Sequence, residues 1–476
     1  MDIVNVHAAL LTENKIKLHG IRWFVGFLLI VCGFLVMFAW HFFGVINEVL
    51  SEYFQVSEST TDWLTMSAAI GGIFGGPIIG FLFVLRPTVV KMWYIVMILI
   101  TVSAFVIFAI VIYIKKYLIL CMIAEFAVGT ITMVFFALLP LTATVWFGER
   151  EQATVLGIGW LSMMIAVLVA SFVPMAIFTE NENIEKEMTH LSLLLLSFAA
   201  VGIICLGCVC LFVPNAPKIP PSYAELQRLK IAAGNNNETC ATALWRFAKE
   251  VKLILVDRVS ATLFVIFAVV DAIFVAEYML APASSRILEY QNSTNPVSPH
   301  ETSESRGNVL LSYSAGGLIG CVGMGFLADK MKAYNPIANI LGISMCVSVT
   351  ASLLGYIYRV KPLEYTSNFL YGLITLAFYP FMQEIIKQQV YPSVQESTQG
   401  IFVAFIGGVL CVVIPYLMRT AMIKFAKVAF YAISVSIFVI IEILIISIKP
   451  TMKRFIYDSN EANAADNEQS HDEDAD

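Results

Sequence analysis

Long hydrophobic segments alternate with short polar ones along this chain of 476 residues. Most of these segments exceed the roughly 18–20 residues that a helix needs to cross a bilayer. Inside lipid the backbone must satisfy its own hydrogen bonds, so the pattern predicts helices rather than loops or open sheets. We therefore predict an all-α membrane protein with twelve transmembrane helices, over residues 22–46, 63–85, 89–114, 117–143, 153–178, 190–213, 260–282, 308–328, 336–358, 366–390, 398–418 and 427–448.

The longest polar interval, residues 214–258, has six predicted spans on each side. Two six-helix bundles joined by a polar hinge are typical of transporters built from internal repeats. We predict a cytosolic N-terminal tail, an N-terminal bundle, a cytosolic central loop, a C-terminal bundle and an acidic, disordered cytosolic tail, over residues 1–20, 21–213, 214–258, 259–448 and 449–476. The composition agrees with a membrane protein, because 59% of the residues are hydrophobic and only 13% are charged, more apolar surface than a soluble protein of this size can bury.

The basic residues predict the orientation. If the N-terminus is cytosolic, 19 of the 29 Lys and Arg residues fall on the cytosolic side and 10 on the other. This bias places both termini in the cytosol. Asn292-Ser-Thr294 then matches a glycosylation sequon in an outer loop, so we expect Asn292 to be glycosylated.

Two further patterns concern packing. Glycines recur at matched places in the second and eighth spans, which indicates an internal repeat and close helix contacts: Gly71, Gly72, Gly75 and Gly76, and Gly316, Gly317, Gly320 and Gly323.

In the central loop, residues 244–255 have one apolar helical face. That segment is either a helix on the inner leaflet or an extension of the seventh span.

A short motif follows the eighth span. Gly325-Phe-Leu-Ala-Asp329-Lys330 resembles the G-x-L-x-D-[RK] signature of the major facilitator superfamily. The resemblance implies that Asp329 and Lys330 take part in gating, with the aspartate accepting bonds from a neighbouring helix N-terminus. In the first half the corresponding run is Gly80-Phe-Leu-Phe-Val84, where valine replaces the acid.

Several short motifs, by their order and spacing along the chain, together resemble the feline leukaemia virus subgroup C receptor family, a branch of that superfamily associated with choline, ethanolamine and haem. They are Arg22-Trp23, the run from Phe38 to Ile46, Val145-Trp-Phe-Gly148, Pro220-Pro-Ser-Tyr-Ala224, the run from Tyr379 to Glu384, Tyr391-Pro392 and Gly400. The resemblance implies that Trp40 contacts the substrate. It also marks departures, since the family's two glutamines fall near Met164 and Gly407 and its basic residue falls on Leu141. This chain is therefore a divergent relative.

Acids inside spans are costly, at about 2.5 kcal/mol or more each, and so suggest function. Four such acids stand out, Glu125, Asp271, Glu277 and Glu384, on the fourth, seventh and tenth spans, which line the cavity in the facilitator arrangement. We expect Asp271 and Glu125 to bind substrate and to face each other across the site. Glu277 belongs at the outer mouth. Glu384 is a gating candidate, although an ion pair with Lys387 three residues on is the simpler explanation.

Aromatic side chains complete the predicted substrate site. A tryptophan face attracts a quaternary ammonium group by about 0.5–2 kcal/mol. Trp40, with His41, Trp160, Phe378 and Tyr379 near it, can supply such a lining.

We therefore expect a secondary transporter of a small organic solute, most simply a choline-like or amine-bearing cation. One alternative is a proton-coupled carrier of a vitamin-like or haem-type solute. Another is a transport-inactive membrane receptor or scaffold. We expect no enzyme activity, no cofactor, no metal and no nucleic-acid partner. The expected protein is a monomer in contact with membrane lipids, in the plasma membrane rather than an endolysosomal or mitochondrial membrane.

The orientation has a direct test. Cys240 lies in the predicted cytosolic loop, so an impermeant thiol reagent added to intact cells should leave it unlabelled and should label it after permeabilisation. Strong labelling of Cys240 in intact cells would reverse the predicted topology.

Overall fold

This computed structural model describes residues 16–86, 89–178, 184–234, 239–291, 299–331, 334–454 and 456–457. The regular elements of that part of the chain are helices, and twelve segments are long and apolar enough to cross a membrane. The predicted all-α fold with twelve spans is thereby confirmed.

Six spans precede the central loop and six follow it. The first six lie in α2 (Arg22–Val45), α4 (Glu58–Leu85), α5 (Val90–Ile114), α6 (Leu118–Trp146), α7 (Gln152–Ile177) and α8 (Ile184–Phe212). The second six lie in α11 (Arg258–Gln291), α12 (Pro299–Met331), α13 (Tyr334–Ile357), α14 (Lys361–Val390) and α15 (Glu396–Ser447). Three further helices, α3 (Asn47–Phe54), α9 (Tyr223–Gly234) and α10 (Cys240–Val256), lie between spans.

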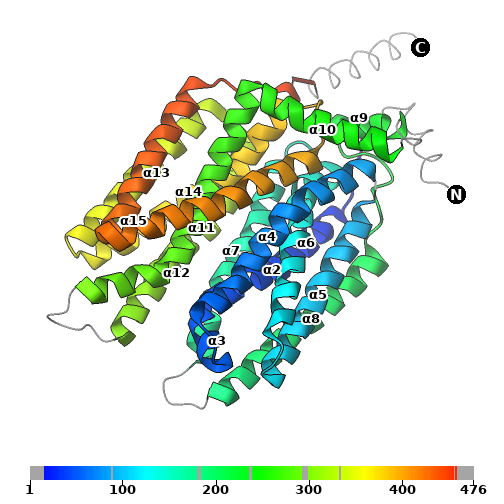
Figure 1. Cartoon of the computed structure of the whole chain (residues 1–476). Coiled ribbons are helices and arrows are strands. Elements are labelled where there is room, and N and C mark those ends of the chain that lie inside the picture. Colours follow the sequence, from blue (N-terminus) through cyan, green and yellow to red (C-terminus); the bar gives the residue numbers. More distant parts are fainter. Residues whose placement is uncertain are drawn as a thin grey trace, which may run out of the picture.

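Helix α15 holds two spans in one helical run of 52 residues, Glu396–Met422 and Val428–Ser447. A straight helix of that length would reach about 78 Å, well over twice the roughly 30 Å of the bilayer core. Figure 1 shows the run turning back on itself. The two separate spans predicted from the sequence are therefore both present, without a helical break between them.

The two halves meet through a few helices. Helix α7 packs against α12 and α14, and α15 packs against α4 and α6. Close contact at these places depends on glycine, because a Cβ at Gly157 of α7 would collide with the Cys321 carbonyl of α12. A Cβ at Gly400 of α15 would likewise collide with the Phe136 carbonyl of α6. The backbones thus touch across the interface between halves.

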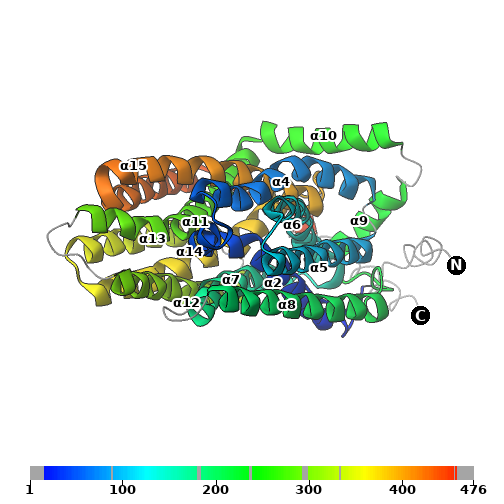
Figure 2. The same cartoon turned by 60° about the horizontal axis from the view of Figure 1, so that its bottom comes forward.

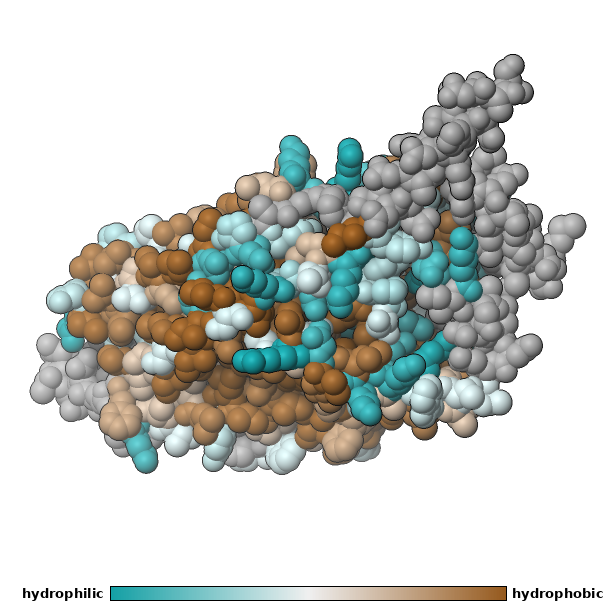
Figure 3. All heavy atoms as spheres, turned by 90° about the horizontal axis from the view of Figure 1, so that it is seen from above, coloured by the Kyte–Doolittle hydropathy of each residue, from teal (hydrophilic) through white to brown (hydrophobic). Residues whose placement is uncertain are grey.

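One end of the bundle carries the connecting helices. We call it the terminal face: α2 begins there, α14 and α15 end there, and α9 and α10 lie there (Figure 1). In Figure 2, α10 runs along the edge of the bundle beside α4. Hydrophobic side chains cover much of the surface in Figure 3, with hydrophilic ones gathered toward the middle and right of the view.

Helix α10 is separate from the seventh span. The backbone is extended at Asp257 (φ −74°, ψ 108°), between the end of α10 and the start of α11. Thr239 caps its first turn by accepting a hydrogen bond from the Thr242 amide at 3.3 Å. Of the two possibilities left open by the sequence, the extension of the seventh span is not what the structure contains.

The matched glycines occupy equivalent helix contacts in the two halves. Gly71 of α4 faces the backbone of α6 at Phe126, and Gly320 of α12 faces the backbone of α14 at Leu373. Because backbone atoms cannot move aside as a flexible side chain can, a side chain at either position must separate the two helices.

Leucine at Gly320 should therefore lower the free energy of unfolding by about 1–3 kcal/mol, the usual cost of overpacking. The measurement is thermal unfolding of the purified protein. Gly323→Leu is the matched control, because a Cβ at Gly323 on the same helix meets nothing within 4 Å. Equal destabilisation by both variants would show that the contact between α12 and α14 is not the constraint.

Candidate functional site

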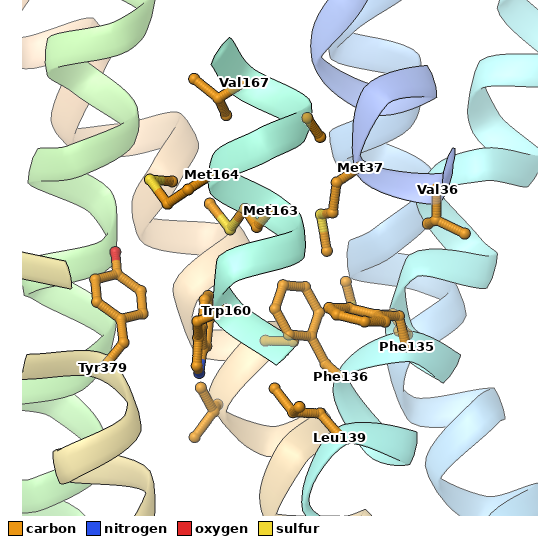
Figure 4. Close-up of a cluster of buried hydrophobic side chains, with 14 of the residues drawn as sticks. Val36, Met37, Phe135, Phe136, Leu139, Trp160, Met163, Met164, Val167 and Tyr379 are labelled. Carbon is orange, nitrogen blue, oxygen red and sulfur yellow. The ribbon is translucent and has the colours of Figure 1, made fainter. Parts of the chain in front are cut away.

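Four buried aromatic side chains meet between the two halves: Phe136 of α6, Trp160 of α7, Phe267 of α11 and Tyr379 of α14. The ring centroid of Trp160 is 4.4 Å from that of Tyr379, 5.8 Å from Phe267 and 5.7 Å from Phe136. Figure 4 shows Trp160 between Tyr379 and Phe136. Each of the four residues lies about two to three helical turns from the end of its helix at the terminal face. We call these four residues the central aromatic cluster.

The polar atoms of Trp160 and Tyr379 form hydrogen bonds to side chains on neighbouring helices. The Trp160 indole donates to Gln383 Oε1 at 2.9 Å, which joins α7 to α14. The Tyr379 hydroxyl donates to Asp271 Oδ1 at 2.8 Å, which joins α14 to α11. Buried polar groups are rarely left unpaired, and these two bonds fix the orientation of both rings. Gln383 lies in the run from Tyr379 to Glu384, but nothing in that run indicated a partner in the other half.

Asp271 is a partly exposed residue of the seventh span. Besides Tyr379, the Cys411 thiol approaches its Oδ2 at 3.7 Å. No Lys, Arg or His forms an ion pair with Asp271 among the residues that the structure describes. A carboxylate at this depth without a basic partner favours neutralisation by a proton or by a bound cation.

The two positions at which the family's glutamines are missing lie near this site. A Cβ at Gly407 would be 2.9 Å from Asp271 Oδ2, so the missing side chain leaves room for the carboxylate. Met164 is buried, and its sulfur would lie 3.2 Å from a Cβ at Gly317 of α12. Figure 4 shows Met164 on the same side of α7 as Tyr379. Gly407 therefore adjoins Asp271 within the second half, whereas Met164 lies at the interface between α7 and α12.

Trp40 and His41 are partly exposed near the end of α2 that is remote from the terminal face. Their ring centroids are 5.9 Å apart, and His41 Nδ1 lies 2.8 Å from the Met37 carbonyl oxygen. Phe378, by contrast, is fully buried. Trp40 and His41 are thus less buried than Phe378, and they lie on the side away from the terminal face.

The other predicted acids differ in their surroundings. Glu125 is 0% exposed, and its oxygens have no hydrogen-bond partner among the described residues. No hydrogen bond or ion pair in the described part of the chain joins it to Asp271. Glu277 lies in α11, but its side chain is outside those described, and Asn292 is outside the described residues. Glu442 of α15, which the sequence analysis did not single out, packs against Gly342 of α13.

Asp329 joins the two halves at the terminal face. Its carboxylate accepts bonds from the amides of Ala153 and Thr154, at 3.0 and 2.7 Å, and from the Thr154 hydroxyl at 2.6 Å. These groups belong to the first turn of α7, where backbone amides have no partner within the helix and the helix dipole favours an anion. Lys330 beside it is exposed and lies over the Phe326 ring at 4.2 Å.

Two further contacts close the same face. Lys387 forms the ion pair with Glu384 that the spacing predicted, at 2.5 Å, and also donates to Gln152 of α7 at 2.7 Å. Arg454, which follows α15, is fully buried and lies 3.6 Å from Glu396 Oε1. It also donates to Thr144 of α6 at 3.3 Å. The terminal face is therefore closed by bonds between halves, while Trp40, His41 and Asp271 remain partly exposed.

Known proteins resemble this chain along most of its length. The family model of the Major Facilitator Superfamily matches residues 29–415. An uncharacterised MFS-type transporter of Caenorhabditis elegans is 24% identical over 332 residues, which is 70% of this chain and 53% of that protein. This chain therefore spans about half the length of that relative. The choline/ethanolamine transporter flvcr2a of Danio rerio is 20% identical over 398 residues, covering 82% of this chain and 78% of the relative.

Solved structures show the same fold. The proton:xylose symporter XylE matches with a TM-score of 0.63 at 11% identity, covering 91% of this chain and 98% of that one. The fucose:proton symporter FucP of E. coli matches with a TM-score of 0.64 at 12% identity, covering 89% and 98%. The family match extends over most of the chain, and the twelve spans and the packing of the halves agree with it. The chain belongs to the major facilitator superfamily of membrane transporters.

Proposed function

We propose that this chain is a secondary transporter of a small organic cation, choline-like or amine-bearing, and a divergent relative of the feline leukaemia virus subgroup C receptor family. Asp271 carries the proposal. It is partly exposed inside the membrane-spanning region and has no basic partner in the described part of the chain. A bound cation supplies the missing positive charge, and attraction between charges is strong where water is scarce.

The surroundings of Asp271 suit an alkylammonium group. Tyr379 holds one carboxylate oxygen, and Phe274 and Phe267 stand 6.2 and 5.1 Å from the Tyr379 ring. Aromatic faces attract methylated ammonium groups through the ring quadrupole. Trp40, partly exposed on the side away from the terminal face, is the proposed first contact for a cation that enters from there.

The relatives support the same substrate class without fixing it. One is the choline/ethanolamine transporter flvcr2a of Danio rerio, described above, and another is the human choline/ethanolamine transporter FLVCR2, 22% identical over 54% of this chain and 46% of that protein. A proton-coupled carrier of a vitamin-like or haem-type solute is the second candidate, because a proton can also neutralise Asp271. A transport-inactive receptor or scaffold is the third.

The cation proposal predicts the effect of two substitutions. Asp271→Asn should weaken choline exchange in proteoliposomes by roughly 10- to 150-fold at every pH, since a bond to a charged group is lost. Trp40→Ala should weaken it by about 2- to 30-fold, the range of a cation–π contact. The measurement is exchange of labelled choline with equal pH on both sides.

Glu442→Gln is the matched control, because it removes another carboxylate from a span of the same half and should leave exchange unchanged. Exchange that survives Asp271→Asn while accumulation driven by a pH gradient is lost would favour the proton-coupled carrier. Wild-type values for both in Asp271→Asn would reject the proposed site. No uptake of any solute by the wild-type protein would favour the receptor or scaffold.

Alternating access requires the terminal face to open. Asp329 links α12 to α7, so Asp329→Asn should shift the protein toward the state that is open there, by about tenfold or more for the loss of charge-assisted bonds. Cys321 reports the change, because it is 0% exposed and lies against Gly157 of α7. We expect faster alkylation of Cys321 by N-ethylmaleimide, quantified by mass spectrometry.

Glu185→Gln is the control for this measurement. Glu185 is an exposed carboxylate near Lys115 on the side away from the terminal face, so its loss should not expose Cys321. Unchanged alkylation of Cys321 in the Asp329→Asn protein would show that Asp329 does not hold the terminal face closed.

A further inference from the structure

Helix α10 covers the place where the first half lacks its acid. Val84 aligns with Asp329 in the repeated Gly-Phe-Leu motif and is 0% exposed. Arg246 of α10 donates to the Val84 carbonyl oxygen at 2.8 Å. The ring of Phe247 fills the space beside Gly80, where a Cβ would come within 2.7 Å of it. The central loop is therefore attached to the end of α4 at the position of the missing acid.

The same helix sends a carboxylate into the second half. Glu250 is 5% exposed, and its Oε2 accepts hydrogen bonds from the Thr398 hydroxyl at 2.5 Å and from the Gln395 amide at 3.3 Å. Both donors lie at the start of α15, where amides lack partners within the helix. Helix α10 thus bonds to α4 on one side and to α15 on the other.

This contact repeats the one made by Asp329. Thr154 is the third residue of α7 and Thr398 is the third residue of α15, and each donates its hydroxyl to a carboxylate. Each carboxylate also accepts a backbone amide from the same helix start. The helices that begin there are the fifth span of each half. One acid comes from the motif after the eighth span, and the other comes from the central loop.

We propose that Glu250 replaces the acid missing at Val84, so that α10 forms the second latch holding the terminal face closed. This inference rests on transport by alternating access and not on the identity of the substrate. It assigns a gating role to a segment that its sequence marks only as an amphipathic helix. The exposed lysines on that helix, Lys249 and Lys252, have no part in the latch.

The charges around Glu250 make the latch sensitive to protons. Burial raises its pKa to about 7, and Glu396 of α15 adds to the rise. The bonds from Thr398 and Gln395 and the charge of Arg246 oppose it. Glu396 in turn lies near Arg454. Once the latch opens and water reaches Glu250, its pKa should return to about 4.3.

The direction of the pH effect follows from these two values. Glu250 binds its proton more tightly in the closed state than in the open state, so acid favours closure. This stabilisation of the closed state is lost as the pH rises through about 7. Between pH 6 and pH 8 the opening equilibrium should increase by about tenfold, given pKa values of about 7 and about 4.3.

The first test replaces Glu250 by alanine and measures alkylation of Cys321 by N-ethylmaleimide in the purified protein at pH 7. We expect the rate to rise by about 2- to 30-fold, the range for loss of a helix cap. Lys252→Ala, an exposed change on the same helix, should have no effect. A wild-type rate in Glu250→Ala would overturn the latch.

The second test restores the acid at its usual place. Adding Val84→Asp to Glu250→Ala should return the rate toward that of the wild type. Gly80, one turn before Val84 on α4, lies against Ile401 near the start of α15, and the new carboxylate would take the position in the motif that Asp329 has in the other half. If the double variant stays as open as Glu250→Ala, then Glu250 does not replace an acid at Val84.

The third test uses Glu250→Gln, which keeps the shape of the side chain and should therefore preserve its packing. At each pH the Cys321 rate of the wild type is divided by that of the Gln variant, which removes the intrinsic pH dependence of the thiol. The ratio should rise by about tenfold from pH 6 to pH 8, and a flat ratio would contradict the proton-sensitive latch. None of these measurements uses substrate, so they test the latch independently of choline transport.

Discussion

An uncompensated carboxylate inside the membrane is the constraint on which the proposed transport depends. Asp271 has Tyr379 and Cys411 as hydrogen-bonding neighbours but no basic residue among those described. Removing a charge from water costs several kcal/mol unless an opposite charge or a proton compensates it. Packing around Asp271 can orient the carboxylate but cannot neutralise it. Under the proposed function, a bound cation or a proton supplies that neutralisation.

The repeated architecture explains how the terminal face closes. In each half the fifth span begins with a threonine that donates to a carboxylate, Thr154 to Asp329 and Thr398 to Glu250. The first carboxylate belongs to the helical bundle, and the second belongs to the loop between the bundles. Having valine instead of an acid at position 84 thus need not abolish the symmetry of the gate, because a different segment can supply the carboxylate.

Much of the fold follows from the sequence, because lipid leaves the backbone few choices. The helices begin and end within six residues of the predicted bounds, except where α15 continues through a turn and where α11 and α12 run beyond the apolar segments. The ion pair of Glu384 and Lys387 was predictable because both lie on one helix.

Contacts between distant segments were not predictable in this way. The partners of Trp160 and Asp271 come from other helices, Gln383 and Tyr379. Glu250 and Arg454 resembled ordinary surface charges in the sequence, and only the tertiary packing buries them. Glu125 shares the hydropathy context of Asp271, yet it is fully buried without a hydrogen-bond partner among the described residues.

The central claim is that a positive charge on the substrate neutralises Asp271. The most direct measurement compares choline with 3,3-dimethylbutan-1-ol, its uncharged analogue of nearly the same shape, in thermal unfolding of the purified protein. Choline should raise the melting temperature in proportion to the logarithm of its concentration above the dissociation constant, and the alcohol should have little effect. Equal stabilisation by both compounds, or stabilisation by the alcohol alone, would contradict the central claim.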